Sequence, residues 1–189
     1  MARKFNPEDK NLLLETSRQE LIDPQRILSF LPLRTYQIVG DIGCGPGYFT
    51  IPLAKYLFDG KVWAVDVQQE MLDALQERLK QVHLTNVEPL LSSDAKLPFD
   101  KDSLDGALLA FVLHETKNKK GFLAQVKESL KKGGWAAILE WYKKETEYGP
   151  PLEARIEEEE AQELVAKAGF RFTSLRDLNG KHYMLLLRK

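Results

Sequence analysis

Apolar and polar residues alternate along the chain with two different periods. Short runs rich in Val, Ile, Leu and Ala predict buried strands, and longer segments with apolar residues three or four positions apart predict helices. Strands are expected over residues 37–42, 61–66, 87–91, 104–110, 135–141, 170–178 and 183–188. Helices are expected over residues 48–57, 68–81 and 157–168. Another helix is expected around Phe122, Val126 and Leu130, ending at Gly133-Gly134.

The order of these elements predicts an α/β fold. Strand–helix units follow one another and end in two strands joined by Asn179-Gly180, a dipeptide typical of a tight hairpin. We therefore expect one doubly wound sheet, mostly parallel, with an antiparallel edge strand. Two short helices are expected before residue 37. Asp23 is placed to cap the second helix and Pro24 to occupy its first turn. These helices either cover the ligand-binding end of the sheet or simply pack against it.

Length, composition and charge narrow the class of protein. The 189 residues suit one domain, residues 1–189, with the helical segment 1–36 as a cover. A net charge of −1 argues against a nucleic-acid binder, which would carry a basic excess. The single Cys44 cannot form an internal disulfide, which favours a cytoplasmic location. No apolar run reaches the roughly 18 residues that a membrane span needs.

A glycine-rich loop follows the first expected strand and precedes a helix. The run Asp41–Gly47 reads D-I-G-C-G-P-G. Glycine permits positive φ angles and a close approach of the backbone to a ligand. Parallel sheets bind ligands beyond the carboxyl ends of their strands, which is where this loop falls. A tight turn without a ligand is the competing interpretation, and three alternating glycines in this context favour a binding loop.

Acidic residues follow the next two strands. Asp66 ends the second strand, where a carboxylate can accept hydrogen bonds from the hydroxyls of an adenosine ribose. The third strand is followed by Asp94 and Ala95. The Asp94 carboxylate can accept from an adenine amino group, and the Ala95 N–H can donate to the ring. The alternative role for Asp94 is to stabilise a turn.

Two adenosine-containing ligands compete for this loop. Nicotinamide cofactors require Gly-x-Gly-x-x-Gly, which seats a pyrophosphate on a helix N-terminus. Here the spacing is Gly-x-Gly-x-Gly, and Pro46 lacks an N–H that a phosphate would use. The Asp41 carboxylate would repel a pyrophosphate but attract an ammonium group. S-adenosylmethionine, with adenosine at one end and an amino acid at the other, therefore fits better.

On these motifs the chain resembles the class I S-adenosylmethionine-dependent methyltransferases. The resemblance runs from about Phe5 to the last strand, and its most specific motifs are residues 39–47 and 130–134. Within the superfamily the chain is most similar to the small ubiquinone/menaquinone-biosynthesis-type enzymes, through residues 111–115, 139–141 and 149–151. The resemblance implies a Rossmann-like methyltransferase fold whose seven-stranded sheet has the order 3-2-1-4-5-7-6.

The resemblance also implies roles for single residues. Gly43, Gly45 and Gly47 would line the methionine portion of the cofactor, and Asp41 would act on its ammonium group. Asp66 would hold the ribose. Further cofactor contacts are implied for Val67 and Met71 beside the adenine, Asp94 and Ala95 at its edge, and Ala110 and Phe111 at the methionine end.

The chemistry of methyl transfer limits what the protein must supply. In an in-line displacement at a sulfonium, the leaving group is a neutral thioether, so no acid is required. A general base is needed only if the acceptor must lose a proton. His114, with an ordinary pKa near 6.5, is the candidate base, and Glu140 is the second candidate catalytic residue. Each has a structural alternative, because His114 can bond the loop or the cofactor's carboxylate and Glu140 can bond loop amides.

Missing motifs point to a small organic acceptor. Residues 110–113 read A-F-V-L, not the Asn/Asp-Pro-Pro-Tyr motif of enzymes that methylate base or glutamine amino groups. They also lack the Asp of metal-dependent catechol methyltransferases, so no metal is expected. A monomer or homodimer is expected. Two alternatives stay open: a nicotinamide-dependent oxidoreductase, and a non-catalytic S-adenosylmethionine-binding partner protein that docks through the lysine-rich segment Lys117–Lys144.

Overall fold

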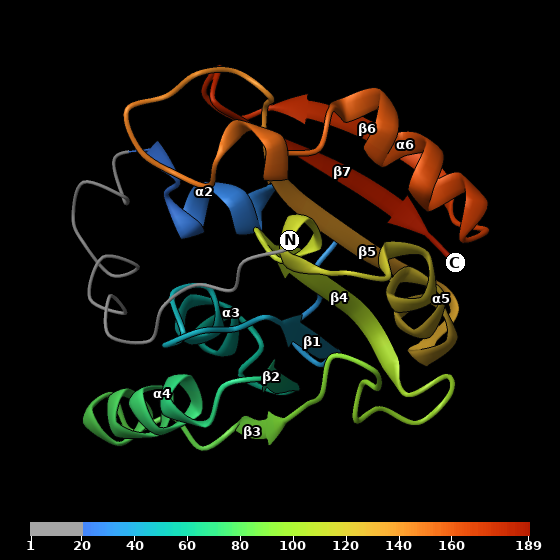
Figure 1. Ribbon diagram of the computed structural model, residues 1–189. Coiled ribbons are helices and arrows are strands. Elements are labelled where there is room, and N and C mark those ends of the chain that lie inside the picture. The colour runs from blue at the N-terminus through green and yellow to red at the C-terminus, as the bar shows by residue number, and fades with distance from the viewer. Residues whose placement is uncertain (1–20) are drawn as a thin grey trace.

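Seven strands form one mixed sheet in the computed structural model, which describes residues 21–189 (Figure 1). The strands are β1 (Ile38–Ile42), β2 (Lys61–Asp66), β3 (Val87–Leu91), β4 (Leu104–Ala110), β5 (Leu130–Trp141), β6 (Arg171–Asp177) and β7 (His182–Arg188). Their order, β3-β2-β1-β4-β5-β7-β6, confirms the expected topology. Strand β7 runs antiparallel to both neighbours, and β6 occupies the edge beside it. The fold class is thus the predicted doubly wound α/β sheet.

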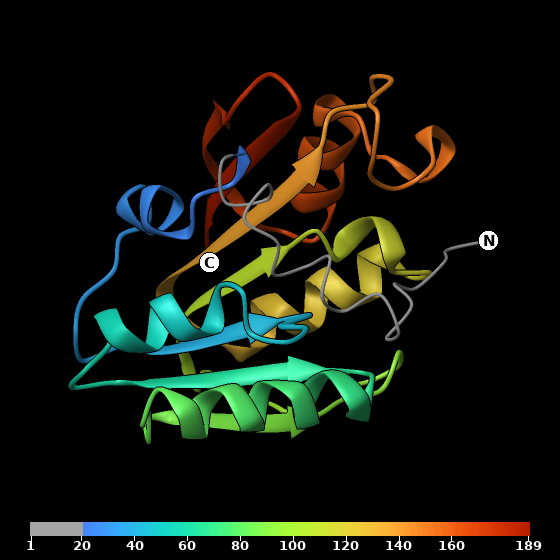
Figure 2. The same cartoon turned by 90° about the vertical axis from the view of Figure 1, so that its left-hand side faces the viewer.

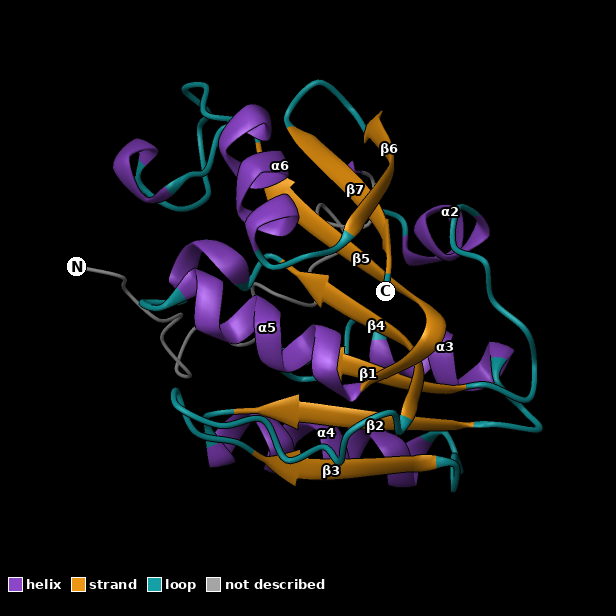
Figure 3. Cartoon of the chain, turned by 90° about the vertical axis from the view of Figure 1, so that its right-hand side faces the viewer, coloured by secondary structure: helices purple, strands orange, loops and turns teal. Residues whose placement is uncertain are grey.

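Helices cover both faces of this sheet. Helices α2 (Pro24–Ser29), α3 (Thr50–Tyr56) and α4 (Gln69–Gln81) lie on one face, nearest the viewer in Figure 2. Helices α5 (Lys119–Ser129) and α6 (Glu158–Lys167) lie on the other face, nearest the viewer in Figure 3. Two short 3-10 helices, η2 (Leu113–Glu115) and η3 (Leu152–Ala154), lie in connections after β4 and β5.

The central strand β4 shows why the sheet needs both layers. Successive side chains of a strand point to opposite faces. Leu108 packs in the core cluster that includes α2 and α3, whereas Leu109 packs with α5 and α6. Both are fully buried, and each such leucine contributes roughly 1.5–3 kcal/mol. A strand that is apolar on both faces is therefore stable only between two helical layers.

The second of the two predicted N-terminal helices is present as α2. The Asp23 carboxylate accepts a hydrogen bond from the Gln25 N–H at 2.9 Å, and Pro24 is the first helical residue, as expected. Ile27 and Leu28 bury this helix against the α3 face of the sheet. The first predicted helix lies outside the described residues. The extent of the cover, and the single domain over residues 1–189, stay predictions.

Two adjoining predicted boundaries are wrong. The sequence predicts that the helix around Phe122 ends at Gly133-Gly134 and that the next strand begins at Trp135, but α5 ends at Ser129 and β5 begins at Leu130. Leu130 pairs with Leu104 of β4, so this residue belongs to the sheet and the helix ends before it. The register then shifts before Trp135 pairs with Gly106, and Gly133 has a φ of +76° within this irregular stretch.

Parallel pairing aligns the ends of four strands at one edge of the sheet. Ile42, the last residue of β1, pairs with Val65 on one side and Leu109 on the other. Ala110, the last residue of β4, pairs with Leu139 of β5. The segments that follow β1, β2, β4 and β5 are therefore neighbours, and they carry most of the candidate residues.

Candidate active site

The glycine loop after β1 has the backbone conformation that its glycines predict. Gly43, Gly45 and Gly47 have φ angles of +76°, +52° and +88°, in the region that L-residues rarely adopt. A Cβ added at Gly43 would lie 2.8 Å from Val112 Cγ2 and 2.9 Å from Val112 Cβ. A Cβ added at Gly47 would lie 2.5 Å from Leu75 Cδ1. The loop therefore packs closely between the segment after β4 and helix α4.

A Gly43→Ala variant is expected to unfold more easily than a Gly133→Ala variant. Both glycines have a φ of +76°, but a Cβ at Gly133 would meet nothing within 4 Å. The two variants share the backbone strain, and Gly43→Ala adds a clash with Val112. We expect Gly43→Ala to cost about 1–3 kcal/mol more free energy of unfolding than Gly133→Ala, measured by urea denaturation. Equal losses would contradict the close packing of the loop.

Every N–H group between residues 43 and 47 donates to an acceptor within the protein. The bonds run from Gly43 and Cys44 to the Val65 carbonyl at 2.7 and 3.0 Å, from Gly45 to Asp66 Oδ2 at 2.9 Å, and from Gly47 to the Cys44 carbonyl at 3.0 Å. Pro46 has no N–H. A pyrophosphate seated on this loop would have to displace these bonds, so the loop is poorly suited to a dinucleotide.

Asp41 is a buried carboxylate that accepts a hydrogen bond from a threonine. It is 1% exposed on β1, and the Thr50 hydroxyl donates to its Oδ2 at 2.6 Å. Burial raises the pKa of Asp41 to about 7, against the effect of the Thr50 bond, and the nearby Asp66 carboxylate adds to the rise. A cationic group next to Asp41 would stabilise its charged form. Thr50 could not be predicted as the partner of Asp41, because no local sequence pattern indicates this role.

Asp66 lies at the end of β2 and accepts hydrogen bonds from the glycine loop and from the segment that leads into α4. Its Oδ2 accepts from Gly45 of the glycine loop, and its Oδ1 accepts from the N–H of Gln68 at 3.0 Å. The carboxylate is 8% exposed and lies at the same edge of the sheet as Gly43. Each carboxylate oxygen has two lone pairs, so an oxygen that accepts a backbone N–H can also accept a ligand hydroxyl.

The remaining predicted cofactor residues follow β2, β3 and β4. Val67, directly after Asp66, is 37% exposed, whereas Met71, in the first turn of α4, is 2% exposed. Asp94 and Ala95 are exposed in the turn after β3. Their roles beside an adenine stay predictions.

An aromatic cluster lies beyond β4 and β5. Phe111, after Ala110 at the end of β4, has a φ of +63°, which is unusual for a bulky residue and typical of functional sites. Its ring centroid lies 5.3 Å from His182 and 6.0 Å from Trp141. Trp141 also contacts His182 at 4.0 Å and Tyr148 at 6.1 Å. Rings from β5, β7 and two connecting segments thus meet at the same end of the sheet as the glycine loop.

His114 and Glu140, the two predicted catalytic residues, are brought together. Glu140 is fully buried at the end of β5, and its Oε2 lies 2.8 Å from His114 Nδ1. Its Oε1 accepts from the His114 backbone N–H at 3.0 Å. Burial opposes protonation of His114, but the Glu140 charge and hydrogen bond outweigh it and raise the pKa of His114. This pairing fixes the ring with Nε2 directed away from Glu140.

Arg155 organises the long connection between β5 and α6. The side chain is 5% exposed, and its guanidinium carbon lies 4.9 Å from the Trp141 ring centroid. Its hydrogen-bond acceptors are the carbonyls of Tyr142, Lys144, Tyr148 and Pro150 and the hydroxyl of Thr146. Arg155 could not be predicted from the sequence, since one arginine in a glutamate-rich segment has no recognisable motif.

Tyr142 is poorly placed to act as a base at neutral pH. Its ring packs against Tyr183 at 5.2 Å. Burial and the neighbouring Asp177 raise the pKa of Tyr142 to about 12.

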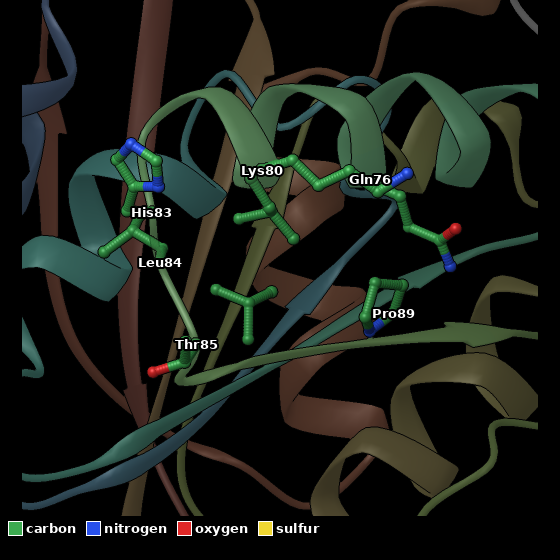
Figure 4. A pocket seen from close by; sticks show the side chains of 8 residues that line it. Gln76, Lys80, His83, Leu84, Thr85 and Pro89 are labelled. Atoms are coloured by element: carbon green, nitrogen blue, oxygen red, sulfur yellow. The ribbon is translucent and has the colours of Figure 1, made fainter.

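A pocket of about 580 Å³ lies between the end of α4 and the start of β3 (Figure 4). Its lining includes Lys80, His83 and Pro89 and none of the predicted site residues. Within residues 21–189, no three His, Cys, Asp or Glu side chains are grouped to hold a metal ion. The same residues contain no helix with the length and hydropathy to cross a membrane.

Comparison with known proteins identifies the class. A methyltransferase domain model matches residues 39–134. A solved S-adenosylmethionine-dependent methyltransferase from Aquifex aeolicus superposes with a TM-score of 0.93, at 32% identity over 98% of this chain and 99% of that one. The chain belongs to this methyltransferase family, and it is an S-adenosylmethionine-dependent methyltransferase. The nicotinamide-dependent and non-catalytic alternatives are thereby set aside.

Curated relatives match over shorter lengths. The ubiquinone/menaquinone biosynthesis C-methyltransferase of Burkholderia vietnamiensis is 35% identical over 105 residues, 54% of this chain and 42% of the relative. The tRNA(Phe) (4-demethylwyosine(37)-C(7)) aminocarboxypropyltransferase of Methanocaldococcus jannaschii is 33% identical over 62% of this chain and 45% of its own length. The chain therefore spans less than half the length of the curated relatives it matches.

Proposed function

We propose that this enzyme methylates a small organic acceptor by in-line transfer, with His114 as the general base and Glu140 holding it. The observation that carries the proposal is the His114–Glu140 pair at the carboxyl ends of β4 and β5. The bond from Nδ1–H to Glu140 selects the tautomer whose Nε2 can accept a proton, as a carboxylate does in other histidine-based sites. An acceptor that must lose a proton would meet this nitrogen.

The site features fit the cofactor at both of its polar ends. S-adenosylmethionine supplies an electrophilic methyl group on a sulfonium. We assign its ammonium to the buried Asp41, and the amino-acid portion to the loop of Gly43, Gly45 and Gly47. Asp66 accepts from the ribose hydroxyls. The other assigned contacts are Val67, Met71, Asp94 and Ala95 for the adenine, and Ala110 and Phe111 for the methionine end.

The cluster of Phe111, Trp141 and Tyr148 supports an acceptor with an apolar face. Trp141 directly follows Glu140 on β5. Its ring contacts both Phe111 and Tyr148, and the Arg155 guanidinium lies against it. Three backbone carbonyls of the connection between β5 and α6 accept hydrogen bonds from the Arg155 guanidinium, which holds the connection beside Trp141. A small molecule packed against the rings would be oriented for transfer, and orientation alone can supply roughly 7–11 kcal/mol.

Product analysis with purified protein tests the proposal. The protein is incubated with S-adenosylmethionine and a panel of acceptors that includes phenols, thiols, amines and compounds with a nucleophilic carbon atom. Methyl transfer releases S-adenosylhomocysteine, whereas aminocarboxypropyl transfer, the activity in the name of one relative, releases 5′-methylthioadenosine. We expect acceptor-dependent release of S-adenosylhomocysteine with small acceptors. Release only with RNA or protein would contradict the proposed acceptor class.

Replacing Asp66 with alanine is expected to weaken cofactor binding. Loss of hydrogen bonds to a charged group should reduce the binding free energy of S-adenosylmethionine by about 1.5–3 kcal/mol, measured by calorimetry. The control is Asp73→Ala, which removes an exposed carboxylate from α4. Unchanged affinity in a folded Asp66→Ala variant would remove Asp66 from the ribose site.

A further inference from the structure

Arg78 reaches from helix α4 to the glycine loop. Its Nη1 donates a hydrogen bond to the Pro46 carbonyl at 2.5 Å, across 32 positions of sequence. The same nitrogen lies 3.7 Å from the position of a Cβ on Gly47. The Arg78 side chain is half-buried, and burial lowers its pKa. None of the ion pairs within residues 21–189 involves Arg78, so the loop carbonyl is its main polar contact there.

This bond and one other hold a single peptide group from opposite sides. The carbonyl of the Pro46–Gly47 peptide accepts from Arg78, and its N–H donates to the Cys44 carbonyl at 3.0 Å. Gly47, with a φ of +88°, has wide conformational freedom, so this peptide plane can rotate when its bonds are lost. Arg78 therefore limits the rotation of this peptide, three residues before α3 begins at Thr50.

We propose that Arg78 is a positioning residue for the cofactor, which presets the end of the glycine loop for the cofactor's amino-acid portion. The inference rests on the proposed assignment of this loop to that portion. A loop already held in its binding conformation does not lose conformational entropy on binding, so affinity is higher. The Arg78 side chain donates to the loop at Pro46, whereas the adenosine end is assigned to Asp66, Val67, Met71, Asp94 and Ala95.

A ligand pair separates this role from a purely structural one. S-adenosylhomocysteine carries the amino-acid portion, and 5′-methylthioadenosine lacks it. A residue that only stabilises the fold would change neither affinity in a folded variant, or would change both together. A residue that presets the glycine loop would change only the affinity for S-adenosylhomocysteine.

The experiment measures both affinities by calorimetry in wild type and in three variants. Arg78→Met removes the donor, Arg78→Lys keeps a charge and a donor, and Lys80→Met removes a neighbouring exposed charge that pairs with Glu77. We expect Arg78→Met to weaken S-adenosylhomocysteine about tenfold and to leave 5′-methylthioadenosine within about twofold. Arg78→Lys is expected to stay within about threefold of wild type for both ligands, and Lys80→Met to match wild type.

Two results would overturn the inference. One is an Arg78→Met variant whose affinities for the two ligands fall by the same factor or do not change. The other is a Lys80→Met variant that weakens S-adenosylhomocysteine as much, because charge alone would then explain the effect. If Arg78→Met does not fold, Arg78→Gln replaces it, with the same ratio of affinities as the criterion. A wild-type protein that binds neither ligand would contradict the proposed function itself.

Discussion

A His114→Ala variant is expected to transfer methyl groups roughly 10²–10⁴-fold more slowly than wild type while binding the cofactor normally. The loss is large because a positioned base takes the acceptor's proton as the new bond forms. Single-turnover rates with the acceptor found by product analysis, and calorimetry with S-adenosylmethionine, measure the two quantities. His83→Ala, at the exposed end of α4, is the matched control.

The pH dependence identifies the base more sharply than the rate alone. The pKa of His114 is raised by Glu140, so the rate should rise with pH through a value above 6.5 as the ring becomes neutral. Glu140→Gln removes the charge and puts an NH₂ group where one of the two carboxylate oxygens was, so either the His114 backbone N–H or Nδ1–H loses its acceptor. That variant should be slower, and its remaining inflection should move to lower pH.

Other outcomes would assign His114 differently. If His114→Ala loses cofactor affinity before it loses rate, the ring holds the cofactor and is not the base. If rate and affinity both equal those of wild type, His114 only fastens the connection after β4 to the buried Glu140.

Replacing Asp41 with asparagine is expected to stabilise the cofactor-free protein and to weaken S-adenosylmethionine binding. Without a cation beside it, the ionised carboxylate is unfavourable in its buried position. A pKa raised from 3.8 to about 7 corresponds to at most about 4 kcal/mol. Asparagine carries no charge, and its side-chain oxygen can still accept from Thr50.

The sign of the pH effect follows from proton binding. Between about pH 4 and pH 7 the folded protein keeps a proton on Asp41 that the unfolded chain has released, so wild-type stability falls as pH rises through this window. The Asp41→Asn variant has no such loss, because its amide does not titrate. Urea denaturation should therefore show the gain in the variant growing from pH 5 to pH 7.

Cofactor binding should show the opposite trend. The affinity of wild type should rise between pH 6 and pH 7.5 as Asp41 ionises, and the variant should lose about 1.5–3 kcal/mol of binding free energy at pH 7.5. Thr50→Val is the control, because it keeps the carboxylate but removes its hydrogen bond, so cofactor-free stability should fall. A variant that binds as tightly as wild type at pH 7.5 would place the ammonium elsewhere.

Local patterns in the chain predicted much of this molecule. Some features depend only on residues within a few positions of one another. They are the strand and helix periods, the Asp23 cap, the Asn179-Gly180 hairpin and the glycine loop. Steric limits on φ and the alternation of side chains act at that range, so these features can be predicted from the sequence without knowledge of the fold. The family resemblance added the strand order, and the sheet confirms it.

Contacts between distant residues required the folded chain. His114 meets Glu140 across 26 positions, and Arg78 meets Pro46 across 32. The end of α5 at Ser129 depends on pairing between Leu130 and Leu104. These contacts follow from strand register and from the direction of each side chain, which arise only when the two helical layers close on the sheet. The period of hydrophobic residues predicts which face of a helix or strand is buried, but it does not predict which polar groups of different elements come into contact.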